Sequence, residues 1–519
     1  MLELLEKKTK TLLIEKIKET FQESIDPDQI KLAPPPQKEM GDICAPVGFL
    51  LTKTLKKNPF EIVSLLAEKM SSVSEFKDVQ PAKPGYVNFF YSESFIEESV
   101  KEILENEKAL DFNPIEKTFF LEYVSANPTG PLHIGHGRWA ALGDSAARLL
   151  KKIGYKVYQE FYVNDAGNQV ENLKKTVEAL KSGKPVPEDG YHGEYVQDAL
   201  KSELEPQAFF LEEQKKTLEK FRCAFDSFYS EKSLHESGAI EKAIRLLKEK
   251  GVLYEQEGAL WFRSTDYGDD KDRVLIKSDG NYTYFAPDIA YHLTKIERGG
   301  DELIDILGAD HHGYVKRITA AVSALSEKKV KLDILIGQLV NLFRNGDPVR
   351  MSKRSGEIIT LDEVMDEIGV DALRYILVSK KHTQTVDFDL EEVKKQSKDN
   401  PVFYIQYAFA RIHSIKKNIE EKDYQPEINF KNLEESERQL LLFMLRFKDE
   451  VYKSALNFDP QILAAYLFDL ASLFHQFYEK NRVIDQGNPV KYRLAIIETV
   501  SKVLEEGLSL LGMAAPKRM

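Results

Sequence analysis

Residues 117–138 read KTFFLEYVSANPTGPLHIGHGR, and the rest of the chain is arranged around them. An apolar run rich in β-forming residues occupies 119–124 and ends in a loop that contains Asn-Pro and Gly-Pro turns. Helix-like sequence then runs from 139 to 150, and residues 155–163 again have the composition of a strand. We therefore predict a strand, a helix and a second strand, an arrangement whose usual place is a parallel sheet.

The loop before the predicted helix carries His133 and His136. Ligands of parallel sheets bind at the carboxyl ends of the strands, beside helix N-termini whose free N–H groups attract phosphate. Either imidazole could donate hydrogen bonds to phosphate oxygens as charge builds there, and Gly135 would let a flat base approach the backbone. Two histidines at this spacing also occur on ordinary helices and as metal ligands.

A second stretch, VRMSKRSG at 349–356, follows the last predicted strand of the sheet. Small and hydroxyl residues surround Lys353, and Arg350 and Arg354 flank it. Such a loop can close over a triphosphate and stabilise pyrophosphate as it leaves. In isolation, the same peptide could be a solvated basic loop.

The two stretches together resemble the signatures of class I aminoacyl-tRNA synthetases. Residues 133–136 read HIGH, and 350–354 resembles the KMSKS loop, with arginine in place of the first lysine and of the last serine. The surroundings, and the sequence DALR at 371–374, resemble the arginyl-tRNA synthetase family in particular. This resemblance extends over essentially the whole chain.

The resemblance implies an arginine–tRNA ligase. In such an enzyme the carboxylate of L-arginine attacks the α-phosphate of ATP, with Mg²⁺ on the phosphates, to give arginyl-adenylate and pyrophosphate. A terminal ribose hydroxyl of tRNA(Arg) then takes the arginyl group. We assign catalytic roles to His133, His136 and Lys353, and ATP binding to Gly135, Ser352 and Asp310.

Recognition of arginine needs carboxylates in planar geometry, because the charge of a guanidinium cannot be removed by deprotonation. Glu122 ends the first predicted strand, Asn127 lies in its loop, and Tyr284 and Asp288 occupy a matching strand-to-helix junction. In the arginyl enzymes, matching positions bind the amino acid, so we predict that these four side chains bind arginine. Either carboxylate could instead cap a helix or pair with a structural arginine. Where an assisting glutamine is common, this chain has Asp-His-His at 310–312, which we do not expect to bind a metal.

We predict an α/β protein with a class I synthetase catalytic domain, a Rossmann-type doubly wound parallel sheet. Its three expected parts are a small N-terminal α/β domain that contacts tRNA (1–112), the catalytic domain (113–390) and a helical, DALR-type anticodon-binding domain (391–519). Charged, helix-forming sequence at about 166–250 predicts a helical insertion into the sheet domain. Strand-like runs at 253–262 and 281–285 should join the sheet.

The composition, 42% hydrophobic and 30% charged over 519 residues, is that of a soluble globular protein. There is no apolar run of membrane-spanning length and no signal peptide, so we expect a cytoplasmic protein with no membrane partner. The net charge of −12 argues against general nucleic-acid affinity, hence against a DNA partner. Cys44 and Cys223 are too few for a cysteine-based zinc module, so we expect no structural zinc. We expect a monomer.

Three other interpretations are open at this point. A class I synthetase for another amino acid would share both signatures, and only the pocket residues would separate it. A nucleotidyl transferase that is not a ligase would also use an HxGH helix, yet it would not need a C-terminal helix bundle. An RNA-binding protein without catalysis is the third. In the bundle, Tyr404 and Tyr407 could stack on unpaired bases, although core packing is the expected position of at least one.

Overall fold

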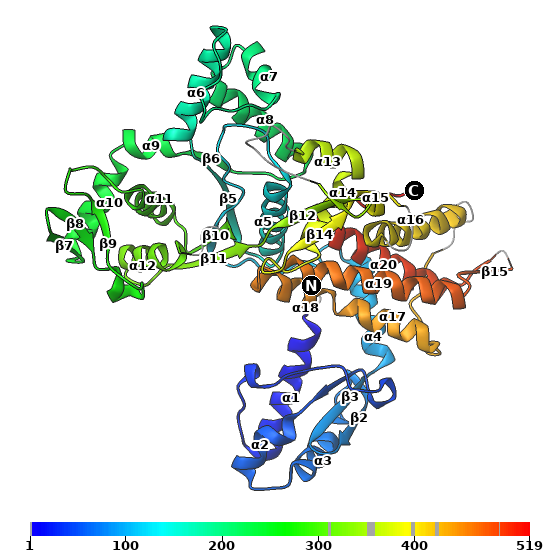
Figure 1. Ribbon diagram of the computed structural model, residues 1–519. Coiled ribbons are helices and arrows are strands. Elements are labelled where there is room, and N and C mark those ends of the chain that lie inside the picture. The colour runs from blue at the N-terminus through cyan, green and yellow to red at the C-terminus, as the bar shows by residue number, and fades with distance from the viewer. Residues whose placement is uncertain (1–2, 310–312, 350–358, 396–399, 421–424, 487) are drawn as a thin grey trace.

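The computed structural model describes residues 3–309, 313–349, 359–395, 400–420, 425–486 and 488–519 (Figure 1). The N-terminal part is built around an antiparallel sheet with the strand order β1-β3-β2. Its elements are α1 (Leu5–Phe21), β1 (Ile43–Ala45), α2 (Val47–Leu55), α3 (Pro59–Met70), β2 (Phe76–Ala82) and β3 (Tyr86–Tyr91). Asn58 caps α3 by accepting a hydrogen bond from the amide of Phe60, and a proline opens the helix. Helix α4 (Glu93–Glu105) leads from this part to the rest of the molecule (Figure 1).

A five-stranded parallel sheet with the order β11-β10-β4-β5-β6 lies at the centre of the molecule. Its strands are β4 (Thr118–Glu122), β5 (Lys156–Val163), β6 (Ser227–Ser230), β10 (Glu302–Gly308) and β11 (Lys331–Gly337). The first strand of this sheet in the sequence, β4, lies in its middle. Strands β5 and β6 follow on one side of β4, and β10 and then β11 lie on its other side. The predicted doubly wound sheet is therefore confirmed, and its topological switch point lies between β4 and β10.

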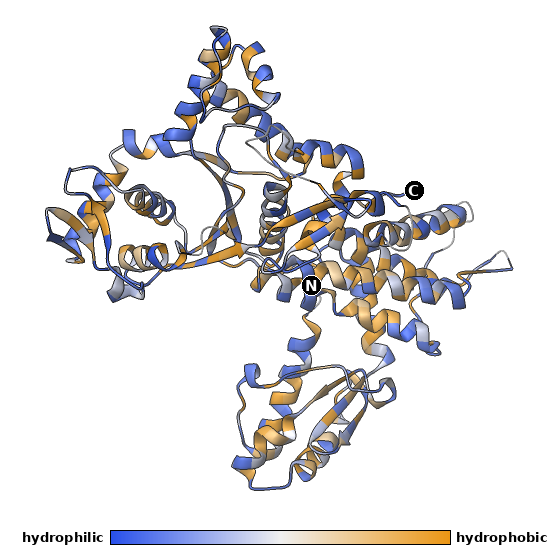
Figure 2. Cartoon of the chain, viewed as in Figure 1, coloured by the Kyte–Doolittle hydropathy of each residue, from blue (hydrophilic) through white to orange (hydrophobic). Residues whose placement is uncertain are grey.

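Helices cover both faces of this sheet. They include α5 (Ile134–Lys152), α11 (Phe285–Glu297) and α12 (Val315–Ser326). Side chains alternate along β4: Phe119 and Leu121 pack in the core cluster that contains α5, whereas Phe120 packs in the cluster of α11 and α12. The strands of the sheet are largely hydrophobic in Figure 2, as expected for strands buried on both faces.

The stretch at 166–250 differs from the predicted helical insertion. The insertion itself comprises α6 (Asn168–Lys181), α7 (Tyr195–Lys201) and α8 (Pro206–Lys220), at the top of Figure 1. Strand β6 then pairs with β5 and belongs to the central sheet, and α9 (Glu231–Glu236) and α10 (Ala239–Glu249) follow it. Strand β6 has only four residues, which are half-buried at the edge of the sheet. So short a pattern cannot be recognised in the sequence between charged helices.

The runs at 253–262 and 281–285 do not join the parallel sheet, and that prediction was wrong. A separate antiparallel sheet is formed by β7 (Leu253–Gln256), β8 (Ala259–Phe262) and β9 (Arg273–Ile276). Glu257 and Gly258 both have positive φ (50° and 73°), and this two-residue turn joins β7 and β8 as a hairpin. Residues 281–284 contain a single isolated bridge before α11 begins. Strand composition indicates an extended segment but does not specify its partner.

The C-terminal part is mainly helical. After β11 come β12 (Val340–Arg344), β13 (Asp347–Pro348), α13 (Leu361–Ile368), α14 (Val370–Val378), β14 (Val386–Asp389), α15 (Leu390–Val393), α16 (Pro401–Glu420), α17 (Glu435–Leu445), α18 (Phe447–Leu456), α19 (Pro460–Lys480), β15 (Ile484–Asp485), β16 (Asn488–Pro489) and α20 (Lys491–Leu510). Strand β14 pairs in parallel with β12. In the described part of the chain, no helix combines the length and apolar composition needed to cross a membrane.

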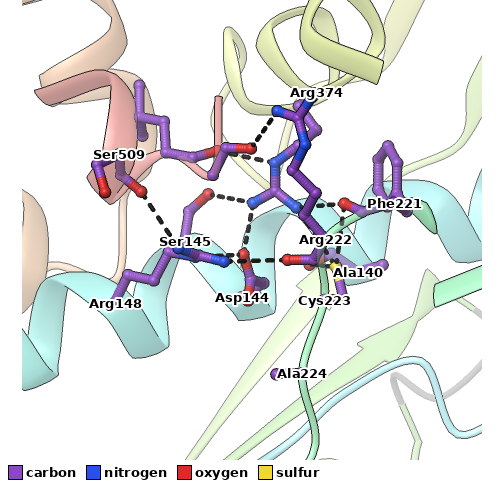
Figure 3. Close-up of polar contacts among 12 residues, drawn as sticks. Ala140, Asp144, Ser145, Arg148, Phe221, Arg222, Cys223, Ala224, Arg374 and Ser509 are labelled. Atoms are coloured by element: carbon purple, nitrogen blue, oxygen red, sulfur yellow. Dashed lines mark hydrogen bonds and ion pairs between the residues drawn. The ribbon is translucent and has the colours of Figure 1, made fainter. Parts of the chain in front are cut away.

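Arg374 of α14, the arginine of the DALR sequence, is fully buried where three segments meet (Figure 3). Its guanidinium donates to Asp144 Oδ2 of α5 at 2.6 Å, to the carbonyl of Leu511 at 2.8 Å and to the carbonyl of Phe221 at 2.9 Å. Nη1 also lies 3.4 Å from Cys223 Sγ. One side chain thus joins the helix after the HIGH loop, the end of the insertion and the end of the C-terminal bundle.

Two further arginines reinforce this junction. Arg148 Nε donates to Asp144 Oδ2 at 2.7 Å, and its other nitrogens reach the carbonyls of Arg222 and Ser509. Arg222 in turn donates to the carbonyl of Gly512 at 3.1 Å. Gly512 has a φ of 69°, and a Cβ there would lie 2.3 Å from Arg374 Cζ, so this position requires glycine.

Arg374→Met should destabilise the protein by about 3 kcal/mol, the lower end of the range for removing one partner of a buried ion pair, because Arg148 still pairs with Asp144. The midpoint of thermal unfolding, followed by circular dichroism, measures the effect. Lys156→Met removes an ion pair with Glu116 that is exposed on both sides, and it should leave the midpoint almost unchanged. Equal midpoints for the two variants would show that the buried junction does not stabilise the fold.

Candidate active site

A cavity of about 780 Å³ opens at the carboxyl ends of β4 and β10, at the switch point of the sheet. Its wall is contributed by the loop after β4, the first turn of α5, α11, the end of β10 and the segment before β12. The sequence-predicted site residues that line it are Glu122, Asn127, His133, Gly135, His136 and Asp288. Residues from both halves of the sheet domain therefore converge on one cavity.

The turn after β4 has an unusual backbone. Val124 and Ser125, which both line the cavity, have φ values of 71° and 41°. A β-branched residue in this region is a steric outlier, and such strain concentrates at functional sites. The turn places Ser125 Oγ where it donates to Glu122 Oε1 at 2.9 Å and accepts from the amide of Tyr162 at 3.1 Å. The strained turn thus orients the carboxylate at the end of β4.

The two histidines form the start of α5. His133 is the N-cap, and its Nδ1 accepts a hydrogen bond from the amide of Gly135 at 3.1 Å. The amide of His133 donates to His136 Nδ1 at 3.2 Å, and the two rings stack with centroids 3.8 Å apart. This capping arrangement fixes both imidazoles at a helix N-terminus on the cavity wall, where anions bind.

Arg138, which sequence reasoning did not single out, anchors the same helix. Its side chain is fully buried, and burial lowers its pKa to about 10. The guanidinium donates to four backbone carbonyls, those of Gln338, Leu339, Lys381 and Gln384. A charged residue two positions after HIGH was visible in the sequence, but its acceptors lie 200 to 246 residues away and only the fold identifies them.

The flanks of the second signature lie beside the first. The amide of Leu361 donates to the carbonyl of Leu132 at 2.8 Å, and Thr360 forms an isolated antiparallel bridge with His133. Upstream, the amide of Val349 donates to the carbonyl of Leu342 in β12. The chain that follows the MSKR segment therefore lies next to the HIGH loop, and the chain that precedes it is tied to β12. Ser352, Lys353 and both flanking arginines fall outside the described residues.

Glu122 is buried, with 6% of its surface exposed, and it is held by an ion pair. Its Oε2 accepts a hydrogen bond from Lys295 Nζ at 2.6 Å, and the same ammonium donates to Asp305 Oδ1 at 2.8 Å. Asp305 also contacts His292 Nε2 at 2.8 Å, and it lines the cavity with Glu122 and His292. The expected carboxylate is present, in a network that the sequence did not suggest.

Asp288 lies in the first turn of α11, and its electrostatic setting differs from that of Glu122. Burial raises its pKa to about 7; the carboxylates of Glu231 and Glu122 add to the rise, while His292 and Arg317 oppose it. Burial and Asp165 likewise raise the pKa of Glu231 to about 7. The cavity therefore has a carboxyl group that changes charge close to neutral pH.

The remaining predicted residues take different positions. Asn127 Nδ2 donates to Gln169 Oε1 in α6 at 2.5 Å, which ties the loop to the insertion. Tyr284 is 87% exposed and is not among the residues that line the cavity, because it precedes the first turn of α11 and its side chain lies in solvent. Tyr162 and Tyr314 bring phenols to the wall instead. Asp310 lies outside the described residues.

The cavity offers other groups for a nucleotide. Arg317 of α12 brings a guanidinium to the wall, and Trp139 of α5 brings an indole. Trp139 packs directly on Gly337 at the end of β11, where a Cβ would lie 1.8 Å from the indole, so only glycine fits. Across the residues that the structure describes, no three histidine, cysteine, aspartate or glutamate side chains are arranged to hold a metal ion.

Three family models match the chain, and together they define the class of protein. The model described as "tRNA synthetases class I (R), catalytic domain" matches residues 99–189 and 207–414. "Arginyl tRNA synthetase N terminal domain" matches 7–91, and "DALR anticodon binding domain" matches 405–519. The sheet order, the HIGH helix cap at the switch point and these matches are those of a class I aminoacyl-tRNA synthetase.

Comparison with individual proteins supports the same class. The chain is 42% identical to Arginine--tRNA ligase of Geobacillus thermodenitrificans over 95% of this chain and 94% of that protein. It is also 42% identical to Arginine--tRNA ligase of Carboxydothermus hydrogenoformans over 97% and 96%. The crystal structure of Thermus thermophilus arginyl-tRNA synthetase has the same fold, with a TM-score of 0.80, 23% identity and coverage of 99% and 100%. The chain belongs to the arginyl-tRNA synthetase family.

The sequence-based identification of the family, the fold class and an arginine–tRNA ligase is confirmed by these matches. Members of this family use ATP, arginine and tRNA as substrates. The roles of the individual residues stay predictions.

Thr360→Ala should destabilise α13 by about 1 kcal/mol, because Thr360 Oγ1 caps that helix by accepting from the amide of Glu363. Since Thr360 is bridged to His133, the rate of arginine activation should also fall, by about fivefold. Ser92→Ala is the matched control: it removes the cap of α4, a similar loss far from the cavity. Single-turnover adenylate formation in the presence of tRNA is the measurement. A similar rate for both variants would contradict a role for the Thr360–His133 contact.

Proposed function

We propose that the cavity binds arginine against Glu122 and Asp288 and activates it with ATP. The observation that carries this proposal is the convergence of two carboxylates, from β4 and from α11, on the cavity that also contains the HIGH histidines. A guanidinium forms its strongest hydrogen bonds with carboxylates, and the amide of Asn127 adds a polar group to the same wall. ATP–pyrophosphate exchange with each amino acid, with and without tRNA, tests the proposal: only arginine should support exchange.

ATP would lie at the N-terminus of α5. The helix N-terminus attracts the α-phosphate, and the stacked imidazoles of His133 and His136 are placed to donate hydrogen bonds as the arginine carboxylate attacks. Gly135 lines the cavity beside this helix N-terminus, and we propose that the adenine lies against it. The protein contributes positioning and charge stabilisation to this step, and no covalent intermediate with the enzyme is needed.

The pyrophosphate would leave toward the MSKR loop. Thr360 and Leu361, which follow this loop in the sequence, contact the HIGH loop, and this supports the assignment of Ser352 and Lys353 to the β- and γ-phosphates. We further propose that ATP is used as its magnesium complex, because Mg²⁺ at such sites is bound through substrate phosphates. The metal in that case belongs to the substrate.

We propose that residues 391–519 read the anticodon and that residues 1–112 contact another part of the tRNA. Tyr407 is 40% exposed, and Arg411 lies 5.7 Å from its ring centroid and 4.1 Å from that of Tyr478, so an aromatic and cationic surface is open for an unpaired base. Tyr404 instead packs on Phe468 and His475 in the bundle. We also propose a cytoplasmic monomer, since both cysteines are free and buried and the matched regions of the family occur in one chain.

The Michaelis constant for arginine should rise as the pH falls below about 7, because Asp288 is then protonated and cannot pair with a guanidinium. The limit for one group is a tenfold rise per pH unit. Asp288→Asn should have a high arginine constant at every pH, through loss of a charge-assisted bond of about 1.5–3 kcal/mol, and a nearly unchanged constant for ATP.

Glu231 titrates in the same range and provides the control. Glu231→Gln should retain the pH dependence, with a lower midpoint, because its carboxylate raises the pKa of Asp288. Steady-state exchange between pH 5.5 and about 8.5 measures both constants. Equal damage to the arginine and ATP constants in Asp288→Asn would remove Asp288 from the arginine pocket.

Lys353→Ala should lower the rate of adenylate formation by about 10²–10³, because an interaction that strengthens as charge moves onto the leaving pyrophosphate lowers the barrier. The apparent affinity for ATP should change less. Arg350→Ala and Arg354→Ala are the matched controls and should have smaller effects. Single-turnover kinetics with tRNA separate the rate from the affinity, and a near-normal rate for Lys353→Ala would mean that the loop is only a basic turn.

A further inference from the structure

Lys295 of α11 lies directly behind the proposed arginine pocket, and its side chain is fully buried. Its ammonium donates to Glu122 Oε2 at 2.6 Å and to Asp305 Oδ1 at 2.8 Å, and it lies 4.2 Å from the ring centroid of Tyr291. A buried ammonium is costly unless it is paired and hydrogen-bonded. These three neighbours therefore fix the position of the ammonium within the wall.

The same network reaches the second carboxylate of the pocket. His292 Nε2 lies 2.8 Å from Asp305 Oδ2, and its Nδ1 lies 2.8 Å from the backbone carbonyl of Asp288. Although burial raises it, the charges of Lys295 and His292 hold the pKa of Asp305 well below its ordinary value. A continuous set of contacts thus runs from Glu122 to the segment that carries Asp288.

Glu122 keeps hydrogen-bonding capacity on the cavity side. One oxygen accepts from Lys295 and the other accepts from Ser125, but each carboxylate oxygen has two acceptor positions. Without the ammonium, Glu122 and Asp305 would be two buried carboxylates with no shared cation, and they would repel each other. A Glu122 carboxylate displaced by this repulsion would no longer meet a guanidinium in good geometry.

We propose that Lys295 is a positioning residue for arginine recognition, which holds the Glu122 carboxylate by an ion pair so that its free acceptor positions face the cavity. Lys295 itself does not contact the substrate. This inference rests on the proposed arginine pocket. It explains why the wall of a pocket that binds the arginine guanidinium contains a buried ammonium. The ammonium compensates the charge of neighbouring carboxylates and leaves their outer lone pairs for the guanidinium.

The test compares charge-balanced variants. Lys295→Met alone leaves two buried carboxylates without their cation and can fail to fold. The double variant Lys295→Met/Asp305→Asn removes one positive and one negative charge together, so the net charge of the wall is kept while Glu122 loses its partner. Asp305→Asn alone keeps the Lys295–Glu122 pair, and the difference between it and the double variant isolates Lys295. Lys331→Met, at an exposed ion pair of β11, is the control for the substitution itself.

Three readouts distinguish positioning from general damage. Relative to Asp305→Asn, the double variant should raise the Michaelis constant for arginine by about 10-fold or more, with kcat and the constant for ATP changed less than about threefold. Inhibition by citrulline, whose neutral ureido group replaces the guanidinium, should weaken less than arginine binding, since a neutral ligand gains less from the Glu122 carboxylate. Thermal unfolding confirms that the double variant is folded.

An unchanged arginine constant in the folded double variant would overturn the inference, and so would a parallel loss in kcat and in both constants. If the double variant does not fold, the Lys295→Leu/Asp305→Asn variant, which makes the same change of charge with a different apolar side chain, replaces it: a normal arginine constant there would also overturn the inference. Failure of the wild-type chain to activate arginine at all is a different outcome, because it would remove the proposed function.

Discussion

The contact between Arg374 and Asp144 holds the catalytic and C-terminal parts together. A guanidinium cannot lose its charge, so once it is fully buried it needs an anion and acceptors on every edge. It finds Asp144 on α5, a carbonyl at the end of the insertion and a carbonyl at the end of the bundle. Asp144 lies ten residues, about 15 Å, from the first residue of the same helix whose N-terminus forms the HIGH cap. The bundle is therefore attached to the element that positions the catalytic histidines.

A second buried arginine, Arg138, fixes the N-terminal end of that helix. Arg138 lies one turn inside α5 and binds four backbone carbonyls of the segments before β12 and before β14. Thr360 and Leu361, which follow the second signature in the sequence, are also held against the HIGH loop by backbone contacts. The geometry of the site thus depends on buried charges whose partners are mostly carbonyls, which cannot be replaced without leaving polar groups unsatisfied.

The two carboxylates of the proposed arginine pocket differ in their surroundings. Glu122 is paired with a buried ammonium, whereas Asp288 has a raised pKa and faces Glu231, another carboxyl with a raised pKa. The charge that Asp288 contributes would depend on pH near neutrality. A pocket of fully charged, unpaired carboxylates would be unstable without substrate. The different surroundings of the two carboxylates avoid this problem and still leave acceptor positions for a guanidinium.

The sequence by itself determined the family, the order of the parts and the place of the site. HIGH and MSKR are local patterns with fixed chemistry, and alternating apolar runs specify a parallel sheet, so both were predictable from neighbouring residues. Strand β6 and the separate sheet of β7, β8 and β9 were not, because the partner of a strand is set by turns and by distant segments.

Only the tertiary structure decided which charges compensate each other. Tyr284 was expected at the pocket and lies in solvent, while Lys295, Arg138 and Arg374 looked like ordinary charged helix residues and are fully buried. Their partners are about 170 residues away for Lys295 and Glu122, and about 230 for Arg374 and Asp144. Burial and pairing at such separations follow from packing of the whole chain, and no local pattern of residues encodes them.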